Sequence, residues 1–217
     1  MVKKTYKKIL SILSILIIIA IIILLGILAY NIYLNYTITD DADEFVDDFD
    51  AILEEATEEE ENEDDTSSNS KTTTSTSTKK VTYKGYEVLG TIEIPKTNVK
   101  YPILAKLTTE SLSISVVAVF PEDIVLNTVG NVVIMGHNYR NGLFFANNKK
   151  LSVGDEIYIT DLEGTKVTYY IYKTFTTEDD DASFYNRDTD GKMEITLSTC
   201  TDDAEKRLII LASNEKV

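Results

Sequence analysis

The spacing of hydrophobic and polar residues divides the chain into three stretches. Residues 9–30 form an uncharged apolar run of 22 residues, residues 31–80 are mostly polar, and residues 81–217 alternate short apolar and polar positions. As a helix the run is roughly 33 Å long, enough to cross a hydrocarbon core of about 30 Å. A cleaved signal peptide has a shorter apolar stretch and a small-residue cleavage site, which is poor here. The pattern predicts a transmembrane signal anchor at residues 9–30, with a cleaved signal peptide as the alternative.

The flanks of this run indicate its orientation. Residues 1–8 carry four lysines, which favours retention of that end in the cytoplasm. The other end carries three tyrosines, a residue type that suits the membrane interface: Tyr30, Tyr33 and Tyr36. We therefore expect a cytoplasmic tail at residues 1–8 and an extracytoplasmic location for everything after the span.

The stretch between the span and the alternating region reads as a linker. Residues 40–65 contain sixteen Asp and Glu and no Lys or Arg. The repulsion among these charges predicts a solvated acidic stalk. A short amphipathic helix available for self-association is the alternative, because apolar residues recur there at helical spacing: Phe45, Val46, Phe49, Ile52, Leu53 and Ala56. Residues 66–80 are Ser/Thr-rich and typical of a flexible spacer. We expect residues 31–80 to be an extracytoplasmic linker and the folded domain to occupy residues 81–217.

Residues 81–217 predict an all-β domain. Eight β-rich runs are separated by turn signals: YEVLGTIEIP, VKYPIL, SISVVAVF, GNVVIMG, DEIYITD, KVTYYIYKTF, MEITLSTC and KRLIILA. Between the fifth and sixth runs, DLEGTK predicts a hairpin with Gly164 at its tight point. So many strands with little room for helix favour a closed or nearly closed eight-stranded β-barrel.

Charge and motif content exclude several functions. The net charge is −15, but residues 81–217 hold 20 Asp and Glu against 14 Lys and Arg, so the acidity belongs mostly to the linker. No basic footprint indicates a nucleic-acid partner. No Gly-rich phosphate loop, CxxC pair or paired-His spacing is present, so no cofactor and no metal site are predicted.

Three residues carry candidate chemistry. Cys200 and His137 each occur once, at the ends of predicted strands, and a Cys–His pair is the minimum set for thiol acyl transfer. A free thiol outside the cell is open to oxidation, which favours a chemical role for the cysteine. Arg207 begins the strand after the cysteine strand and returns to the same barrel end if those strands pair. The structural alternatives are core packing for Cys200, a structural histidine, and a solvated arginine.

Together these features resemble the sortases, cysteine transpeptidases of Gram-positive bacteria. The resemblance covers about residues 89–212 and is carried by LGTIEIPKTNVKYPI, GNVVIMGHNYRNGLFF, TLSTC and the arginine of KRLIILA. It implies a sortase-type eight-stranded β-barrel with the catalytic residues His137, Cys200 and Arg207. It also implies that Thr199 and Arg207 support the substrate and the oxyanion, helped by a backbone N–H beside the cysteine.

The resemblance implies a reaction and its partners. A membrane-anchored sortase cleaves an LPxTG-like sorting motif near the C-terminus of a secreted protein through a thioacyl intermediate on Cys200. It then transfers that protein to an amine of a lipid-linked peptidoglycan precursor in the cell wall. The alternatives are a thiol endopeptidase that only hydrolyses and a non-catalytic surface adhesion or scaffold module.

The sortase subclass stays open. GHNYRNG, TLSTCT and the short gap from Cys200 to Arg207 are similar to class B. Residues 176–191 lack the helical insertion of that class, and their compactness is closer to classes A and D. Class C is disfavoured because no second apolar span follows the barrel.

Calcium binding is a property of some class A members. Residues 178–181 with Glu122 and Asp123 are the corresponding acidic candidates here. We expect them to be solvated and to hold no metal.

Overall fold

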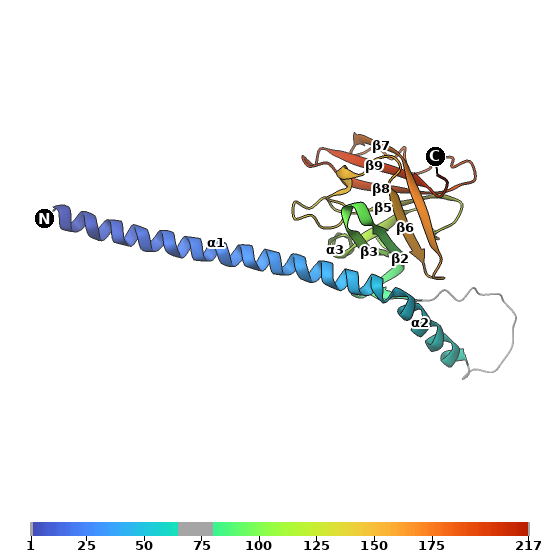
Figure 1. The fold of residues 1–217 in the computed structure, drawn as a ribbon, viewed down its shortest axis with the longest axis horizontal. Coiled ribbons are helices and arrows are strands. Elements are labelled where there is room, and N and C mark those ends of the chain that lie inside the picture. The colour runs from blue at the N-terminus through green and yellow to red at the C-terminus, as the bar shows by residue number, and fades with distance from the viewer. Residues whose placement is uncertain (1, 65–79, 217) are drawn as a thin grey trace. The chain divides into compact units, whose positions relative to one another are not determined.

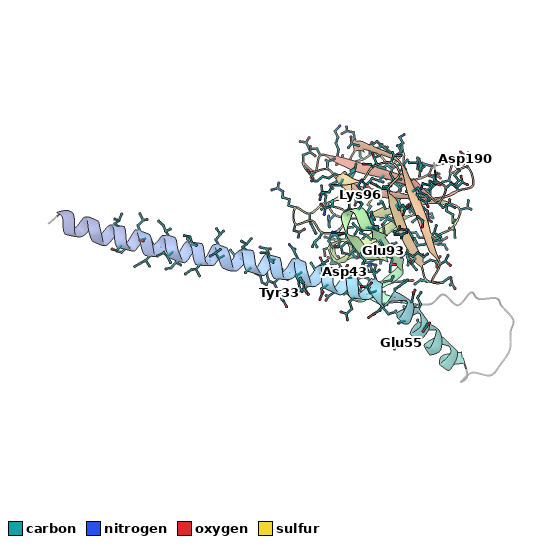
Figure 2. All side chains as sticks on the ribbon, in the orientation of Figure 1. Tyr33, Asp43, Glu55, Glu93, Lys96 and Asp190 are labelled. Carbon is teal, nitrogen blue, oxygen red and sulfur yellow. The ribbon has the colours of Figure 1, made fainter. Side chains whose placement is uncertain are left out.

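The computed structural model describes residues 2–64 and 80–216, in two units, Met1–Asp40 and Asp41–Val217. Helix α1 (Val2–Asp47) is continuous (Figure 1); its residues up to Asp40 belong to the first unit, and its last residues, 41–47, belong to the second. By length and composition it is apolar enough over Leu10–Asp47 to cross a membrane. Its large side chains stand out around the helix, and Tyr33 is 64% exposed (Figure 2). A helix that is apolar all round is typical of a membrane span, consistent with the predicted single-pass anchor.

The second unit contains the predicted eight-stranded β-barrel. Its strands, in spatial order, are β2 (Tyr86–Ile94), β3 (Val99–Leu104), β4 (Val116–Phe120), β5 (Gly130–Met135), β8 (Met193–Cys200), β9 (Lys206–Ser213), β7 (Lys166–Glu178) and β6 (Glu156–Asp161). Pairing of β6 with β2 closes the barrel, and the two-residue strand β1 (Thr82–Tyr83) adds to β2. Each of the eight β-rich runs in the sequence corresponds to one barrel strand, so the fold prediction is confirmed.

Two parallel pairings give the barrel its chain path. Strand β3 pairs with β4, to which helix α3 (Thr109–Ile114) connects it. Strand β5 pairs with β8, and the chain passes through β6 and β7 of the same sheet before β8 returns beside β5 (Figure 1). The remaining barrel pairs are antiparallel, including the β6–β7 hairpin, where Gly164 has φ +76°. Short 3-10 turns lie at Pro95–Thr97 (η1) and Asn148–Lys150 (η2).

Large β-branched and leucine side chains fill the barrel. Fully buried examples from five different strands are Ile92, Ile103, Ile134, Ile157 and Leu197. β-Branched residues fit a pleated, buried surface, and each such side chain contributes about 1.5–3 kcal/mol when it is removed from water. This packing gives the strand ends, where the candidate site residues lie, a rigid support.

The second unit begins at Asp41, ahead of the expected start of the folded domain at Val81. The end of α1 and the start of helix α2 (Phe49–Asp64) form the amphipathic stretch that was the alternative to a solvated stalk, and its apolar face packs on the barrel. Phe49 and Leu53 are buried in a cluster with the barrel residues Val81, Tyr83, Val88, Leu104 and Val117. An apolar stripe of this kind is stabilised by burial, which the neighbouring β1–β2 surface supplies.

Charge pairs flank this contact. Lys84 pairs with Asp41 at 2.7 Å and Lys100 pairs with Asp47, so two of the acidic residues meet lysines of the barrel. The ring of Phe45 lies edge-on to Tyr83, with 4.9 Å between centroids. Residues 41–53 are therefore part of the folded unit. The Ser/Thr-rich spacer falls mostly within residues 65–79, outside the described residues.

The connection from β7 to β8, residues 179–192, lies over one face of the sheet. Phe184 from this loop is buried against Val133, Ile209 and Leu211. Among the described residues this loop contains no helix, in line with its predicted compactness. Both faces of β8 are consequently buried along most of its length.

Candidate active site

Strand pairing brings the three candidate residues to one end of the barrel. Cys200 is the last residue of β8 and lies directly opposite Arg207, near the start of β9. Strand β5 runs parallel to β8, and the N–H of Gly136 donates to the carbonyl of Ser198 at 3.2 Å. His137 directly follows Gly136, so the end of β5 and the end of β8 lie at the same level of the barrel. The pairing of the cysteine and arginine strands, which the sequence analysis stated as a condition, is present as β8–β9.

Arg207 contacts the sulfur of Cys200 directly. Its Nη1 donates to Sγ at 3.2 Å, and both residues are partly exposed. Directly opposite residues in an antiparallel pair place their side chains on the same face, so the contact follows from the register. A guanidinium in this position can stabilise negative charge that develops on a group bonded to the sulfur.

His137 is held in its neutral form at pH 7. Partial burial, and secondly the positive charge of Arg207, lower the pKa of His137 below its ordinary 6.5. The Tyr139 ring stacks on the imidazole, with 4.6 Å between centroids and 24° between planes. Tyr139 also packs against Phe144, which is fully buried, so the stack is anchored in the core. A neutral imidazole beside a thiol can accept its proton.

Close packing explains the glycine before the histidine. A Cβ on Gly136 would lie 2.7 Å from Cδ2 of Phe145, a buried ring with little room to move. The N–H of Phe145 donates to the carbonyl of His137 at 3.0 Å. Glycine at 136 therefore lets the strand end approach this ring. The hydrogen bond from Phe145 in turn fixes the backbone of His137.

Asn138 is a site residue that the sequence analysis missed. Its Nδ2 donates to the carbonyl of Cys200 at 2.9 Å and to Oδ1 of Asp202 at 3.1 Å. It thereby ties the segment after β5 to the end of β8, next to both candidate catalytic residues. Its position directly after the single histidine was the available signal, together with Tyr139 one residue further on.

Thr199 lies beside the nucleophile position but on the other face of the sheet. It is 3% exposed and lies opposite Leu208, at the paired position next to the Cys200–Arg207 pair. Its hydroxyl has no hydrogen-bond partner in the described part of the chain. The N–H of Thr201, directly after the cysteine, already donates to the carbonyl of Lys206 at 2.9 Å. Among these groups, Arg207 is the donor available to an oxyanion.

Two of the acidic residues considered for calcium have separate partners within the protein. Glu178 pairs with Lys206 at 2.6 Å, and Asp181 accepts from the N–H of Ser183 at 2.8 Å. No group of three His, Cys, Asp or Glu within the described residues is arranged to hold a metal ion.

A largely buried ion pair between Arg187 and Glu194 fixes the β7–β8 loop, residues 179–192, over the sheet. Arg187 pairs with Glu194 at 2.7 Å, with side chains only 18% and 8% exposed. Arg187 also donates to Tyr172 Oη at 2.8 Å and to Asn131 Oδ1 at 3.1 Å. Burial, aided by the hydrogen bond to Glu194, raises the pKa of Tyr172 to about 12, so its hydroxyl stays a donor. No sequence pattern indicated this ion pair, because charged residues in a loop are by default solvated.

Comparison with known proteins agrees with this fold. The sortase domain family matches residues 92–215. Sortase A of Bacillus anthracis is 33% identical over 127 residues, covering 57% of this chain and 58% of that protein. Sortase A of Listeria monocytogenes is 28% identical over 132 residues, covering 59% of this chain and 57% of that protein. The chain thus spans less than two thirds of the length of these relatives.

Solved structures show the same architecture. A Clostridium perfringens sortase D5 transpeptidase superposes with a TM-score of 0.58 at 26% identity, covering 80% of this chain and 98% of that one. Sortase A of Listeria monocytogenes superposes with a TM-score of 0.54 at 29% identity, covering 59% of this chain and 88% of that one. The fold and site define a β-barrel with a cysteine, a histidine and an arginine at one end. The chain belongs to the sortase family.

Proposed function

We propose that this protein is a membrane-anchored cysteine transpeptidase that attaches secreted proteins to the cell wall. The observation that carries the proposal is the Arg207 guanidinium on the Cys200 sulfur, with His137 on the adjacent chain segment. Its membership of the sortase family supports the reaction type. The substrates proposed are proteins with a C-terminal LPxTG-like motif and a lipid-linked peptidoglycan precursor.

The first half-reaction forms the thioacyl enzyme. His137 accepts the thiol proton, and the Cys200 sulfur attacks the threonine carbonyl carbon of the motif. The carbon–sulfur bond forms while the carbonyl oxygen takes up negative charge. Arg207 donates to that oxygen, a contribution typically worth about 2.7–4 kcal/mol for one such donor. His137 then protonates the departing amine as the carbon–nitrogen bond breaks.

The second half-reaction transfers the acyl group. An incoming amine attacks the thioester carbon, and His137 takes its excess proton. The carbon–sulfur bond breaks, and the product is an amide that joins the secreted protein to the acceptor. Thr199 beside Cys200 is proposed to shape this site.

Helix α1 is the proposed membrane anchor, which would keep the reaction at a membrane. Helix α1 is proposed to span the membrane once, with residues 1–8 in the cytoplasm and the barrel outside, where sorting substrates arrive. Protease added to intact protoplasts should then remove the barrel. A barrel that stays protected until the membrane is broken would contradict this orientation.

The decisive experiment separates transfer from hydrolysis. Sorting-motif peptides are incubated with the protein, with and without an amine nucleophile, and the products are weighed by mass spectrometry. A transpeptidase gives the amine adduct, and Cys200→Ala gives no product. Hydrolysed peptide alone, at every amine concentration, would instead identify a thiol endopeptidase.

A further inference from the structure

The side chain of His137 is oriented by an aromatic ring. The imidazole stacks on Tyr139, with 4.6 Å between ring centroids and 24° between ring planes. Within residues 2–64 and 80–216, neither imidazole nitrogen forms a hydrogen bond. In a Ser–His–Asp triad a third group, a carboxylate, hydrogen-bonds the imidazole and sets its orientation. Here the stacked ring occupies the position from which the imidazole plane is set.

The backbone directs these two rings to the same side. Asn138, which lies between them in the sequence, forms an antiparallel bridge with Phe144, so the segment is extended there. Residues two apart in an extended segment point the same way, and the residue between them points the opposite way. Asn138 donates to the carbonyl of Cys200, which anchors the middle of this segment. The N–H of Gly142 donates to the carbonyl of Tyr139 at 3.0 Å, so the loop that carries the ring is closed on itself.

Phe144 supports the Tyr139 ring from the barrel core. The two rings lie 5.7 Å apart between centroids, and Phe144 is 1% exposed. Phe144 has φ +54°, a backbone conformation that bulky residues rarely adopt. Its N–H donates to Oη of Tyr101 on β3 at 3.3 Å, and the Tyr101 ring packs against it with 5.1 Å between centroids. Tertiary contacts therefore hold an unfavourable backbone conformation that keeps a core ring against Tyr139.

We propose that Tyr139 is the positioning residue of His137, whose ring fixes the imidazole plane for proton exchange with the Cys200 thiol and the departing amine. The proposal rests on the proposed function, because it concerns the base of the same reaction. Proton transfer requires hydrogen-bond reach and alignment, and a misplacement of about 1 Å can cost about 10²-fold in rate. Stacking uses the ring face and not the hydroxyl, so phenylalanine should serve at position 139.

The test uses two donors that differ in their need for a proton. A sorting-motif peptide with its ordinary threonine–glycine amide releases an amine, which needs a proton from His137 to leave. The same peptide with an aryl thioester at that bond releases a thiolate, which needs none. Acylation of Cys200 by each donor is followed by intact-protein mass spectrometry. Tyr139→Leu should slow acylation by the amide donor about 10- to 100-fold, and the loss with the thioester donor should be smaller by about fivefold or more.

Two further variants are the controls. Tyr139→Phe keeps the ring and should acylate at close to the natural rate with both donors. Tyr158→Leu removes a partly buried tyrosine ring that lies against Lys166 in the β6–β7 hairpin, and should leave both rates unchanged. Partial unfolding of a variant lowers both rates alike, so the ratio between the two donors reports on proton transfer and not on the amount of folded protein.

Three results overturn the proposal: a natural rate for Tyr139→Leu with the amide donor, an equal loss with both donors, or a Tyr139→Phe variant as slow as Tyr139→Leu. In each case, turnover of the amide donor by the natural protein leaves the transpeptidase function standing. Failure of the natural protein to acylate Cys200 with either donor overturns both.

Discussion

Arg207 Nη1 lies 3.2 Å from Cys200 Sγ, across the last paired position of β8 and β9. Seven positions separate these residues in the sequence, and the antiparallel turn between their strands returns the arginine to the cysteine. The contact depends on register alone, since a shift by one residue would move one side chain to the other face. It places a fixed positive group at the point where the proposed reaction develops negative charge.

Replacing Cys200 by alanine should abolish the thioacyl intermediate without unfolding the barrel. The side chain is partly exposed at a strand end, so its loss should change stability by no more than about 1–2 kcal/mol. Intact-protein mass spectrometry with a sorting-motif peptide measures the intermediate, and thermal melts measure stability. Near-normal turnover by this variant would contradict the assignment of Cys200 as nucleophile.

Arg207→Ala should lower kcat by about 10²–10³, because one charged donor to the oxyanion is lost. Arg207→Lys should rescue it poorly, since an ammonium lacks the planar fork of the guanidinium. Thermal melts of both variants serve as the folding control. A lysine variant with nearly full activity would show that charge alone suffices at this position.

His137 should titrate below pH 6.5, because burial and then Arg207 lower its pKa. It is the single histidine of the chain, so NMR observes one imidazole. The unfolded chain binds this proton at higher pH than the folded protein, so stability falls as pH decreases from about 6.5 through the lowered value. Arg207→Ala should move the titration upward, and a midpoint unchanged by that substitution would contradict the proposed coupling.

His137→Ala should slow turnover by about 10²–10⁴.

Arg187→Met should destabilise the barrel by about 3–5 kcal/mol, because it leaves the buried Glu194 carboxylate without its positively charged partner. The double variant Arg187→Met with Glu194→Leu should recover much of this loss, since it removes both charges. Denaturant unfolding measures all three proteins. A single variant as stable as the double variant would show that the Arg187–Glu194 ion pair is solvated in solution.

A chain beginning at Lys80 should be less stable than one beginning at Asp41, because it exposes the barrel surface that Phe49 and Leu53 cover. Leu53→Ala in the longer chain should cost about 2–5 kcal/mol, as for other buried leucines. Glu54→Ala, an exposed neighbour on the same helix, is the control and should change stability little. Equal stability of the two chains in urea would show that residues 41–53 do not hold to the barrel.

Local periodicity in the sequence was enough to predict the apolar helix and all eight barrel strands, because side-chain alternation and helical spacing depend only on near neighbours. Cys200, His137 and Arg207 could be selected because each stands at a strand end and two of them are unique residue types. The amphipathic pattern at Phe49 and Leu53 showed that one helix face needed cover, but not which surface supplies it.

The tertiary structure alone decided which distant segments meet. The parallel pairing of β5 with β8 joins segments about 60 positions apart, and only that pairing brings Asn138 to the carbonyl of Cys200. Arg187 and Glu194 meet as a largely buried ion pair because the loop before β8 folds back over the sheet. The cavity beside Cys200 likewise exists only between folded segments, since Asn138, Thr176 and Leu208 line it from separate stretches of the chain. Such contacts depend on long-range register and burial, which short sequence patterns do not encode.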